Sequence, residues 1–408
     1  MLTTVPTTAP HVLVVGTGQD FPARIRTAAP DARISVLCRA GGAARVQNPD
    51  LVAEIVEVTP GSAGEDWMRL AKAVHAAHPV TRVAAFGELD QDHAAAIGRA
   101  LDVPATAPET VALVHDKAAM RARLRSAGVD PTPSELVDGP DGIVAFLARH
   151  GGPCVVKPVQ GAGSAGVAVV DGPERAEAAY ALATTPFDGI PPAGVLVERF
   201  HTGPQYSVES FSAAGEHEIV AVVRKFSDPA TAVELGHVTP PPEPVGPEVP
   251  PFVRGVLDAL GVRDGPTHTE LVLTVDGPRV VETHVRLAGD EIPELVRIAT
   301  GVDLAEATAR HAVGHTVLPE IRAARRPGPR AAVWFALPPA GGTLRALSAG
   351  DAVPLLDPGD PIAEPLNSDS RLAYALAGGA DALEVARRRA ESVRALVDLA
   401  PVRPTRLL

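Results

Sequence analysis

Short apolar runs alternate with helical patterns over the N-terminal quarter of this 408-residue chain. The apolar runs lie at 11–16, 33–38, 52–58 and 82–86, and the helical patterns at 65–78 and 91–101. Because strands that alternate with helices form βαβ units, this pattern predicts a parallel sheet in an α/β fold. Gly16-Thr17-Gly18 lacks the third glycine and the acidic partner of a dinucleotide site, so we interpret it as an ordinary strand-to-helix turn.

Composition limits the class of protein and its partners. Hydrophobic residues make up 46% of the chain and aromatic residues 3%, so the core must consist mainly of Ala, Val and Leu. The net charge of −12 argues against nucleic acid or a membrane surface as the main partner. The chain has two cysteines, no visible secretory signal and no run of the ~18 apolar residues that span a bilayer, so we expect a cytoplasmic protein.

A boundary marked by Pro104 and Pro108 separates the N-terminal part from the rest. Beyond it we expect helices at 109–127, 140–150, 173–183, 249–260, 291–299, 303–313 and 380–398. We expect strands at 153–157, 166–170, 267–275, 279–286 and 330–337, and three more within 195–226. The Pro-rich segment 227–250 is expected to be a surface loop.

Lysine occurs at only four positions: Lys72, Lys117, Lys157 and Lys225. Lys157 ends an apolar strand just before the glycine-rich turn 161–166, and Lys117 opens a helix. A glycine-rich turn exposes backbone N–H groups that can bind an anion, and a lysine adds a point charge for phosphate oxygens. The alternative is a flexible hairpin with solvated lysines.

A second polar group leaves the apolar strand VLV as Glu198-Arg199-Phe200-His201, with Gln205 shortly after. A carboxylate and adjacent backbone groups at a strand end can bind an adenine amine, and Gln205 can hydrogen-bond a ribose hydroxyl. The alternative is an ordinary strand end with a surface glutamate.

The hairpin around Asp276-Gly277 carries the most informative polar residues. Glu282, His284 and Arg286 alternate along its second strand and share one face. A three-residue loop, Asp276-Gly277-Pro278, places Glu270 opposite His284 and on the same face as Glu282. We prefer this register to a two-residue loop, because it keeps the other face apolar, with Leu271, Leu273, Val275, Val281 and Val285.

Two carboxylates on one face repel each other unless a cation lies between them. Mg²⁺ takes oxygen ligands and bridges protein carboxylates to nucleotide phosphates, so Glu270 and Glu282 are candidate metal ligands. Arg286 would then stabilise charge on a transferred phosphoryl group. The alternative is a surface salt bridge among these residues.

Taken in order, these motifs resemble the ATP-grasp superfamily. The string THTELVLTVDGPRVVETHVRLAGDEIPELV at 267–296 is similar to the carboxylate–amine ligases, including the L-amino acid ligase branch, as are GHVTPPP at 236–242 and DSRLAYALAGG at 369–379. The resemblance implies a Rossmann-like pre-ATP-grasp domain at 1–105, a two-lobed nucleotide clamp with a small lobe at 106–190 and a large lobe at 191–320, and a C-terminal α+β subdomain at 321–408.

The resemblance also implies roles for individual residues. Lys117, Lys157 and the turn with Gly163, Ser164 and Gly166 would hold the ATP phosphates; Glu198 and Phe200 would bind adenine and Gln205 the ribose. Mg²⁺ would bind Glu270 and Glu282, Arg286 would be catalytic, and His237 and Asp290 would lie in the substrate pocket. The family usually has Glu at the position of Gln205 and Asn at the position of His284, which leaves His284 as a metal or phosphate contact.

The resulting hypothesis is an enzyme, an ATP-dependent ligase that joins a carboxylate, such as an amino acid, to an amine through an acyl phosphate. Its cofactors would be ATP and Mg²⁺, its partners small-molecule substrates, and a homodimer is expected from the resembling families. The alternatives are another ATP-grasp reaction, of the purine-pathway or carboxylating kind, and a non-catalytic ATP-binding regulatory module. The sequence identifies neither the carboxylate nor the amine.

Overall fold

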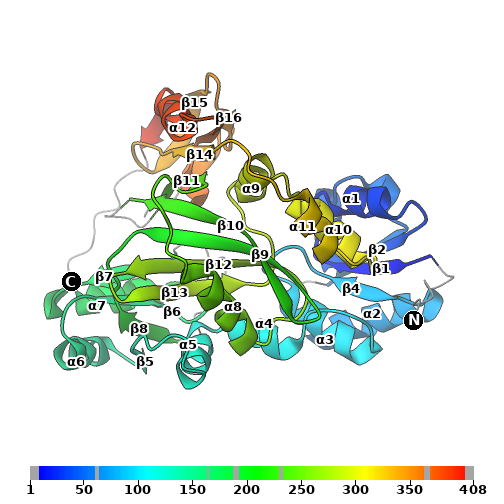
Figure 1. Ribbon diagram of the computed structural model, residues 1–408, viewed down its shortest axis with the longest axis horizontal. Helices are drawn as coiled ribbons and strands as arrows, with labels where there is room; N and C mark the ends of the chain where they lie inside the picture. The colour runs from blue at the N-terminus through cyan, green and yellow to red at the C-terminus, as the bar shows by residue number, and fades with distance from the viewer. Residues whose placement is uncertain are drawn as a thin grey trace.

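The computed structural model describes residues 9–59, 64–161, 163, 165–186, 193–228, 233–362 and 368–399. Within these residues the chain forms four β-sheets with helices packed against them. Figure 1 shows the N-terminal sheet at one end of the molecule, a small sheet at the other end, and a large sheet between them. No described helix is both long and apolar enough to cross a bilayer.

The N-terminal sheet is parallel, as the sequence predicts. Its strands are β1 (His11–Val15), β2 (Arg33–Arg39), β3 (Glu54–Val58) and β4 (Arg82–Ala84), in the order β3-β2-β1-β4. Helices α1 (Phe21–Ala28), α2 (Gly64–Ala77) and α3 (Gln91–Leu101) accompany them. Every residue of β1 is buried, because side chains from both of its faces enter hydrophobic clusters.

The helix expected at 109–127 is two helices, α4 (Pro108–His115) and α5 (Lys117–Ser126). Asp116 lies between them with extended backbone, and its side chain accepts a hydrogen bond of 2.8 Å from the backbone N–H of Ala119. An aspartate at this position caps a helix by satisfying a free N–H of its first turn. The break places Lys117 at the start of α5.

A four-stranded antiparallel sheet, called the small sheet below, is packed against two helices. Its strands are β5 (Ser134–Val137), β8 (Val195–Arg199), β6 (Cys154–Pro158) and β7 (Ala168–Val170), in that order, and its helices are α6 (Pro140–His150) and α7 (Ala176–Ala183). Strand β8 belongs to this sheet, whereas the expected boundary at 190/191 assigns it to the following lobe. The four-part division of the chain stays a prediction.

The large sheet has the order β13-β12-β9-β10-β11-β14-β18-β16. Its strands are β9 (Gln205–Ala213), β10 (Glu216–Ser227), β11 (Glu234–Thr239), β12 (Gly265–Thr274), β13 (Gly277–His284), β14 (Ala331–Ala336), β16 (Val353–Pro354) and β18 (Ala373–Gly378). Strands from the expected C-terminal subdomain therefore continue the sheet of the large lobe. Helices α9 (Ile292–Thr300), α10 (Leu304–Ala312) and α11 (Leu318–Ala324) connect β13 to β14.

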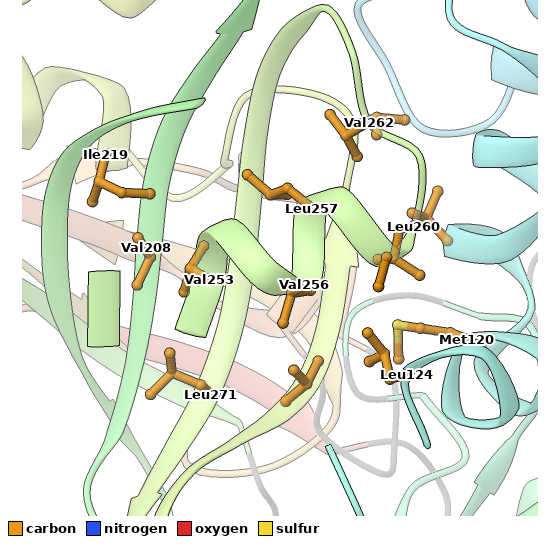
Figure 2. Packing of buried hydrophobic residues seen from close by; sticks show 14 of the residues in the cluster. Met120, Leu124, Val208, Ile219, Val253, Val256, Leu257, Leu260, Val262 and Leu271 are labelled. Carbon is orange, nitrogen blue, oxygen red and sulfur yellow. The ribbon is translucent and has the colours of Figure 1, made fainter. Parts of the chain in front are cut away.

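Helix α8 (Val249–Ala259) packs on the large sheet and forms the centre of a hydrophobic core. Figure 2 shows Val253, Val256 and Leu257 of α8 facing the strands that carry Val208 and Leu271. Met120 and Leu124 of α5 join the same cluster. The core thus fixes α5, and with it Lys117, against the sheet that carries the paired glutamates.

Two expected elements differ in the structure. The segment 227–250 is not simply a loop, because β11 lies within it and pairs with β10 and β14. The helix expected at 380–398 ends early as α12 (Ala382–Glu391), and β19 (Arg394–Leu399) follows. Strand β19 pairs with β15 (Gly342–Ser348), which also pairs with β17 (Pro361–Ile362). In both segments, pairing with distant strands decides the structure.

The register of the β12–β13 hairpin also differs from the prediction. Thr274 pairs with Gly277, so the loop has two residues and Val275 lies fully exposed at its tip. A bulge beside Glu270 shifts the register, because Leu271 pairs with Val280 and Glu270 with Glu282. The predicted loop and the pairing of Glu270 with His284 are therefore wrong. The two glutamates are nevertheless ladder partners, which puts them on one face.

Candidate functional site

A cavity of about 590 Å³ lies between the small and large sheets. The predicted residues that line it are Lys117, Lys157, Glu198, Phe200, Gln205, Glu270 and Glu282. Val281, expected on the apolar face of the hairpin, lines it too, because the bulge leaves this residue without a ladder partner. Gly163 and Gly166 are not among the lining residues, and Ser164 lies outside the described residues.

Glu198 is the centre of a buried ionic network. Its Oε1 lies 2.6 Å from Lys157 Nζ, and its Oε2 lies 2.7 Å from Arg121 Nε. Burial raises the pKa of this carboxyl group, but Arg121 and Lys157 outweigh burial and lower the pKa to about 2. Each oxygen therefore has a cationic partner in this structure, and the contact of Glu198 with adenine stays a prediction.

Arg121 and Asp130 complete the network, and neither was predicted from the sequence. Arg121 is buried, donates to the carbonyl of Val280 at 2.5 Å and lies 3.3 Å from Asp130. The backbone N–H of Val280 donates to the same Asp130 oxygen at 2.7 Å. The position of Arg121 between Met120 and Leu124 on α5 is the one sequence signal that marks it as buried.

The backbone of Phe200 is partly engaged as well. Its N–H donates to the carbonyl of Pro153 at 3.2 Å, whereas its carbonyl accepts no hydrogen bond from any residue that the structure describes. The Gln205 side chain is exposed at the cavity edge, where its Oε1 lies 3.5 Å from the Ser227 hydroxyl.

The paired glutamates each face a lysine. Glu282 Oε2 lies 3.2 Å from Lys117 Nζ, and Glu270 Oε1 lies 2.5 Å from Lys225 Nζ. Burial raises the pKa of Glu282, but Lys117 and His284 hold it well below the usual range. Lys225 and His268 likewise lower the pKa of Glu270 against the effect of burial. Both side chains are therefore carboxylates.

A histidine behind Glu270 orients it. His268 Nε2 lies 3.1 Å from Glu270 Oε1, and His268 Nδ1 lies 2.8 Å from Glu209, a buried residue of β9. Burial lowers the pKa of His268, but the two carboxylates outweigh it and raise the pKa to about 10. Within the described part of the chain, Glu270 Oε2 accepts no hydrogen bond, so one oxygen is held and the other is open.

These donors suit a hard cation. Two opposed carboxylates offer the oxygen ligands that Mg²⁺ prefers. When no ion is bound, Lys117 and Lys225 balance the negative charge of the two glutamates. His284 does not offer a free ligand atom, because Nε2 lies 3.3 Å from Glu282 and Nδ1 lies 3.1 Å from Glu88. The arrangement favours Glu270 and Glu282, and not His284, as ligands.

Arg286 lies outside the lining of the large cavity and is ion-paired with Glu88. Glu88 follows β4, and it also contacts His284 and His115, the latter at 3.2 Å. Burial raises the pKa of Glu88, but His115, His284 and Arg286 outweigh it and lower the pKa. Through His284 and Glu88, the N-terminal sheet is connected to Glu282 and Arg286. Glu88 was not predicted from the sequence.

His237 and Asp290 come together in a second cluster outside the lining of the large cavity, and their place in a substrate pocket stays a prediction. His237 Nε2 lies 3.2 Å from Asp290, and Arg371 holds both Asp290 oxygens at 2.6 and 2.8 Å. Glu234 lies 3.6 Å from His237 and 2.5 Å from Lys225, which joins this cluster to Glu270. Ligand atoms of Glu234, His237 and Asp290 lie within 4.8 Å of one another, but Arg371 and Lys225 already balance their charge.

Comparison with known proteins adds family information. Residues 150–294 match the model of the ATP-grasp domain. An uncharacterized protein, y4rH, of Sinorhizobium fredii is 32% identical over 221 residues, which is 53% of this chain and 46% of the relative. Dapdiamide A synthase of Enterobacter agglomerans is 26% identical over 199 residues, 47% of each chain. The chain thus spans about half the length of the curated relatives it matches.

The L-amino acid ligase of Bacillus licheniformis has a similar solved structure. It superposes with a TM-score of 0.78 over 95% of this chain and 99% of that one, at 19% identity. Together with the family match, this likeness shows that the chain has the ATP-grasp fold with mixed α/β architecture.

Proposed function

We propose that this ATP-grasp protein is an ATP-dependent ligase that joins a carboxylate, such as an amino acid, to an amine. The observation that supports this most is the pairing of Glu270 with Glu282 in the same cavity as Lys117 and Lys157. Opposed carboxylates next to lysines are the charges that a magnesium-bound nucleoside triphosphate needs. The similarity to dapdiamide A synthase and to an L-amino acid ligase supports the reaction class.

The reaction has two steps. A carboxylate oxygen of the substrate attacks the γ-phosphorus of ATP and ADP leaves, which yields an acyl phosphate. The amine nitrogen then attacks the acyl carbon, the bond from that carbon to the phosphate oxygen breaks, and the proton lost by nitrogen leaves with phosphate. No protein nucleophile is required, which agrees with Cys38 and Cys154 being buried with their pKa raised to about 11.

The residues of the site would have different roles in this reaction. Lys117 and Lys157 would face the phosphates, Gln205 the ribose and Phe200 the base, while Glu198 holds Lys157 in place. Glu270 and Glu282 would hold Mg²⁺, which when bound neutralises phosphate charge. Arg286, ion-paired with Glu88, would stabilise the charge that develops on the acyl phosphate. His237 and Asp290 would face the substrate.

The test is release of ADP and phosphate with pairwise mixtures of amino acids, with the products identified by mass spectrometry. We expect ADP only when a carboxylate and an amine are both present, together with an amide product. Glu282→Ala and Arg286→Ala should each lower kcat/KM at least about a hundredfold, the size expected when charge stabilisation in the transition state is lost. Glu65→Ala, on the exposed first turn of α2, is the control and should behave as wild type.

Other outcomes would contradict the proposal. Unchanged turnover in both variants would overturn the roles of Glu282 and Arg286. ADP release with bicarbonate or formate, and not with amino acids, would favour a carboxylating or purine-pathway reaction. ATP binding without ADP formation in any mixture would favour a regulatory module. A homodimer and a cytoplasmic location stay predictions.

A further inference from the structure

The Glu88 side chain lies where the loop after β4 meets the end of β13. Its Oε1 lies 3.2 Å from His115 Nε2, and its Oε2 forms an ion pair with Arg286. His284 Nδ1 lies 3.1 Å from Glu88 Oε2 and 3.2 Å from Glu88 Oε1. A single carboxylate of the N-terminal part thus holds two side chains at the end of the hairpin that carries the paired glutamates.

His284 extends this contact to the proposed metal site. Its Nε2 lies 3.3 Å from Glu282 Oε1 while its Nδ1 faces Glu88, so each ring nitrogen faces a carboxylate. The His284 side chain is 9% exposed, which leaves little room for another orientation. Lys117 Nζ lies 3.2 Å from the other oxygen of Glu282. The carboxylate of Glu282 is therefore oriented by His284 on one side and by Lys117 on the other.

A second contact joins the same two parts of the chain at the backbone. The Gln91 side chain of α3 is buried and donates from Nε2 to the carbonyl of Val285 at 3.4 Å. Val285 lies between His284 and Arg286, so the N-terminal part holds this segment by its backbone and by both flanking side chains. Side chains that hold a metal ligand from behind typically change metal affinity or activity by about 10- to 100-fold.

We propose that Glu88 is a positioning residue for the ligase reaction. Through His284 it orients Glu282 for Mg²⁺, and through their ion pair it fixes the place of Arg286. The N-terminal part then contributes to catalysis without touching the reacting atoms. His284 is the middle of this link, instead of the metal or phosphate contact expected from the sequence. This inference rests on the proposed ligase function and adds a residue to the same site.

The test measures ADP binding by isothermal titration calorimetry, once in excess Mg²⁺ and once in EDTA. The ratio of the two affinities reports on the metal site and requires no turnover. Glu88→Gln and His284→Gln should each lower this ratio about tenfold, because both break the same link behind Glu282. Neither substitution touches Lys157 or Glu198, so the affinity in EDTA should not change. The double variant should be no weaker than either single variant, since its second change removes a link that is already broken.

Turnover separates the two contacts of Glu88. Glu88→Gln also removes the ion-pair partner of Arg286, so it should lower kcat about tenfold more than His284→Gln does. Asp90→Asn is the matched control. Asp90 lies two positions after Glu88 in the same loop, but it pairs with Arg39 of β2 at 2.9 Å, within the N-terminal part. This variant should behave as wild type in both measurements.

The outcomes separate this inference from the proposed function. A wild-type affinity ratio in Glu88→Gln, additive losses in the double variant, or an equal loss of ADP affinity in EDTA would overturn the positioning role while the ligase function stands. A wild-type protein whose ADP affinity does not depend on Mg²⁺ would overturn it too. Absence of ADP formation with every carboxylate and amine would overturn the ligase function, whereas the binding measurements decide separately whether Glu88 acts on the metal site.

Discussion

Four cationic side chains in or near the proposed ATP site are paired with carboxylates: Lys117 with Glu282, Lys157 with Glu198, Lys225 with Glu270 and Arg286 with Glu88. A buried charge is costly unless it is paired, so these pairs keep the site charged before any ligand enters. Binding of ATP would then exchange carboxylate partners of lysine for phosphate oxygens.

The Glu198 network makes a prediction about stability and pH. Glu198→Gln leaves Arg121 and Lys157 buried with one charge less to pair them, so it should lower the free energy of unfolding at pH 7 by about 3 kcal/mol. Because the folded pKa of Glu198 is lowered to about 2, its stabilisation is complete above the unfolded pKa and is lost as pH falls toward 2. The variant should therefore lose less stability than wild type between about pH 5 and pH 2.

Urea unfolding at a series of pH values measures this difference. Glu65→Gln, a change to an exposed glutamate, serves as the control and should follow the wild-type pH profile. Parallel profiles for Glu198→Gln and wild type would show that the carboxylate is not selectively stabilised in the fold.

Residue types and spacing allowed the sequence to indicate the lysines, the paired glutamates and Arg286. Their partners could not be found in the same way. Glu88 lies 198 positions from Arg286, and Arg121 lies 77 positions from Glu198. Only the packing of α5 and of the N-terminal sheet against the large sheet brings these charges together, and no local pattern records it.

At the scale of elements, local signals predicted most strands and helices, and the misses share one cause. Strand β11 lies in a Pro-rich segment and forms because β10 and β14 flank it, and β19 forms because it pairs with β15. The bulge beside Glu270 is also a tertiary feature, because β9 holds β12 from its other side. Glu270 and Glu282 lie on one face as predicted, although the predicted loop is wrong. The two-residue loop alone would put them on opposite faces, and the bulge shifts the register by one residue and returns them to the same face.

The break at Asp116 yields a prediction about one element. Asp116→Ala removes the cap of α5 and should lower the free energy of unfolding by about 1 kcal/mol. It should also raise KM for ATP, because the cap fixes the turn from which Lys117 reaches Gly161 and Glu282. Thermal unfolding and ATP kinetics measure the two effects.

Asp381→Ala is the matched control. Asp381 precedes α12 but makes no capping hydrogen bond with its side chain, so its replacement should cost less and leave KM for ATP unchanged. Equal effects of the two substitutions would contradict the role given to the cap.

The whole molecule brings three parts of the chain to the proposed reaction centre. The small sheet supplies Lys157, the large sheet supplies Glu270 and Glu282, and the N-terminal part supplies Glu88. Arg371, 81 positions beyond Asp290, ties the C-terminal part to the same region. The parallel N-terminal sheet and the ATP-grasp resemblance could be read from the sequence. The sequence does not predict that β14, β18 and β16 continue the sheet of the large lobe. Which strands lie next to each other in a sheet is not recorded in the local sequence of either strand.

The most direct test of the ligase account follows the oxygen atoms of the carboxylate substrate. A carboxylate labelled with ¹⁸O is incubated with the amine substrate, ATP and Mg²⁺, and the phosphate released is analysed by mass spectrometry. An acyl phosphate transfers one carboxylate oxygen to the phosphate, so we predict one ¹⁸O in each phosphate formed together with amide. Phosphate without ¹⁸O, or release of AMP and pyrophosphate, would contradict the account.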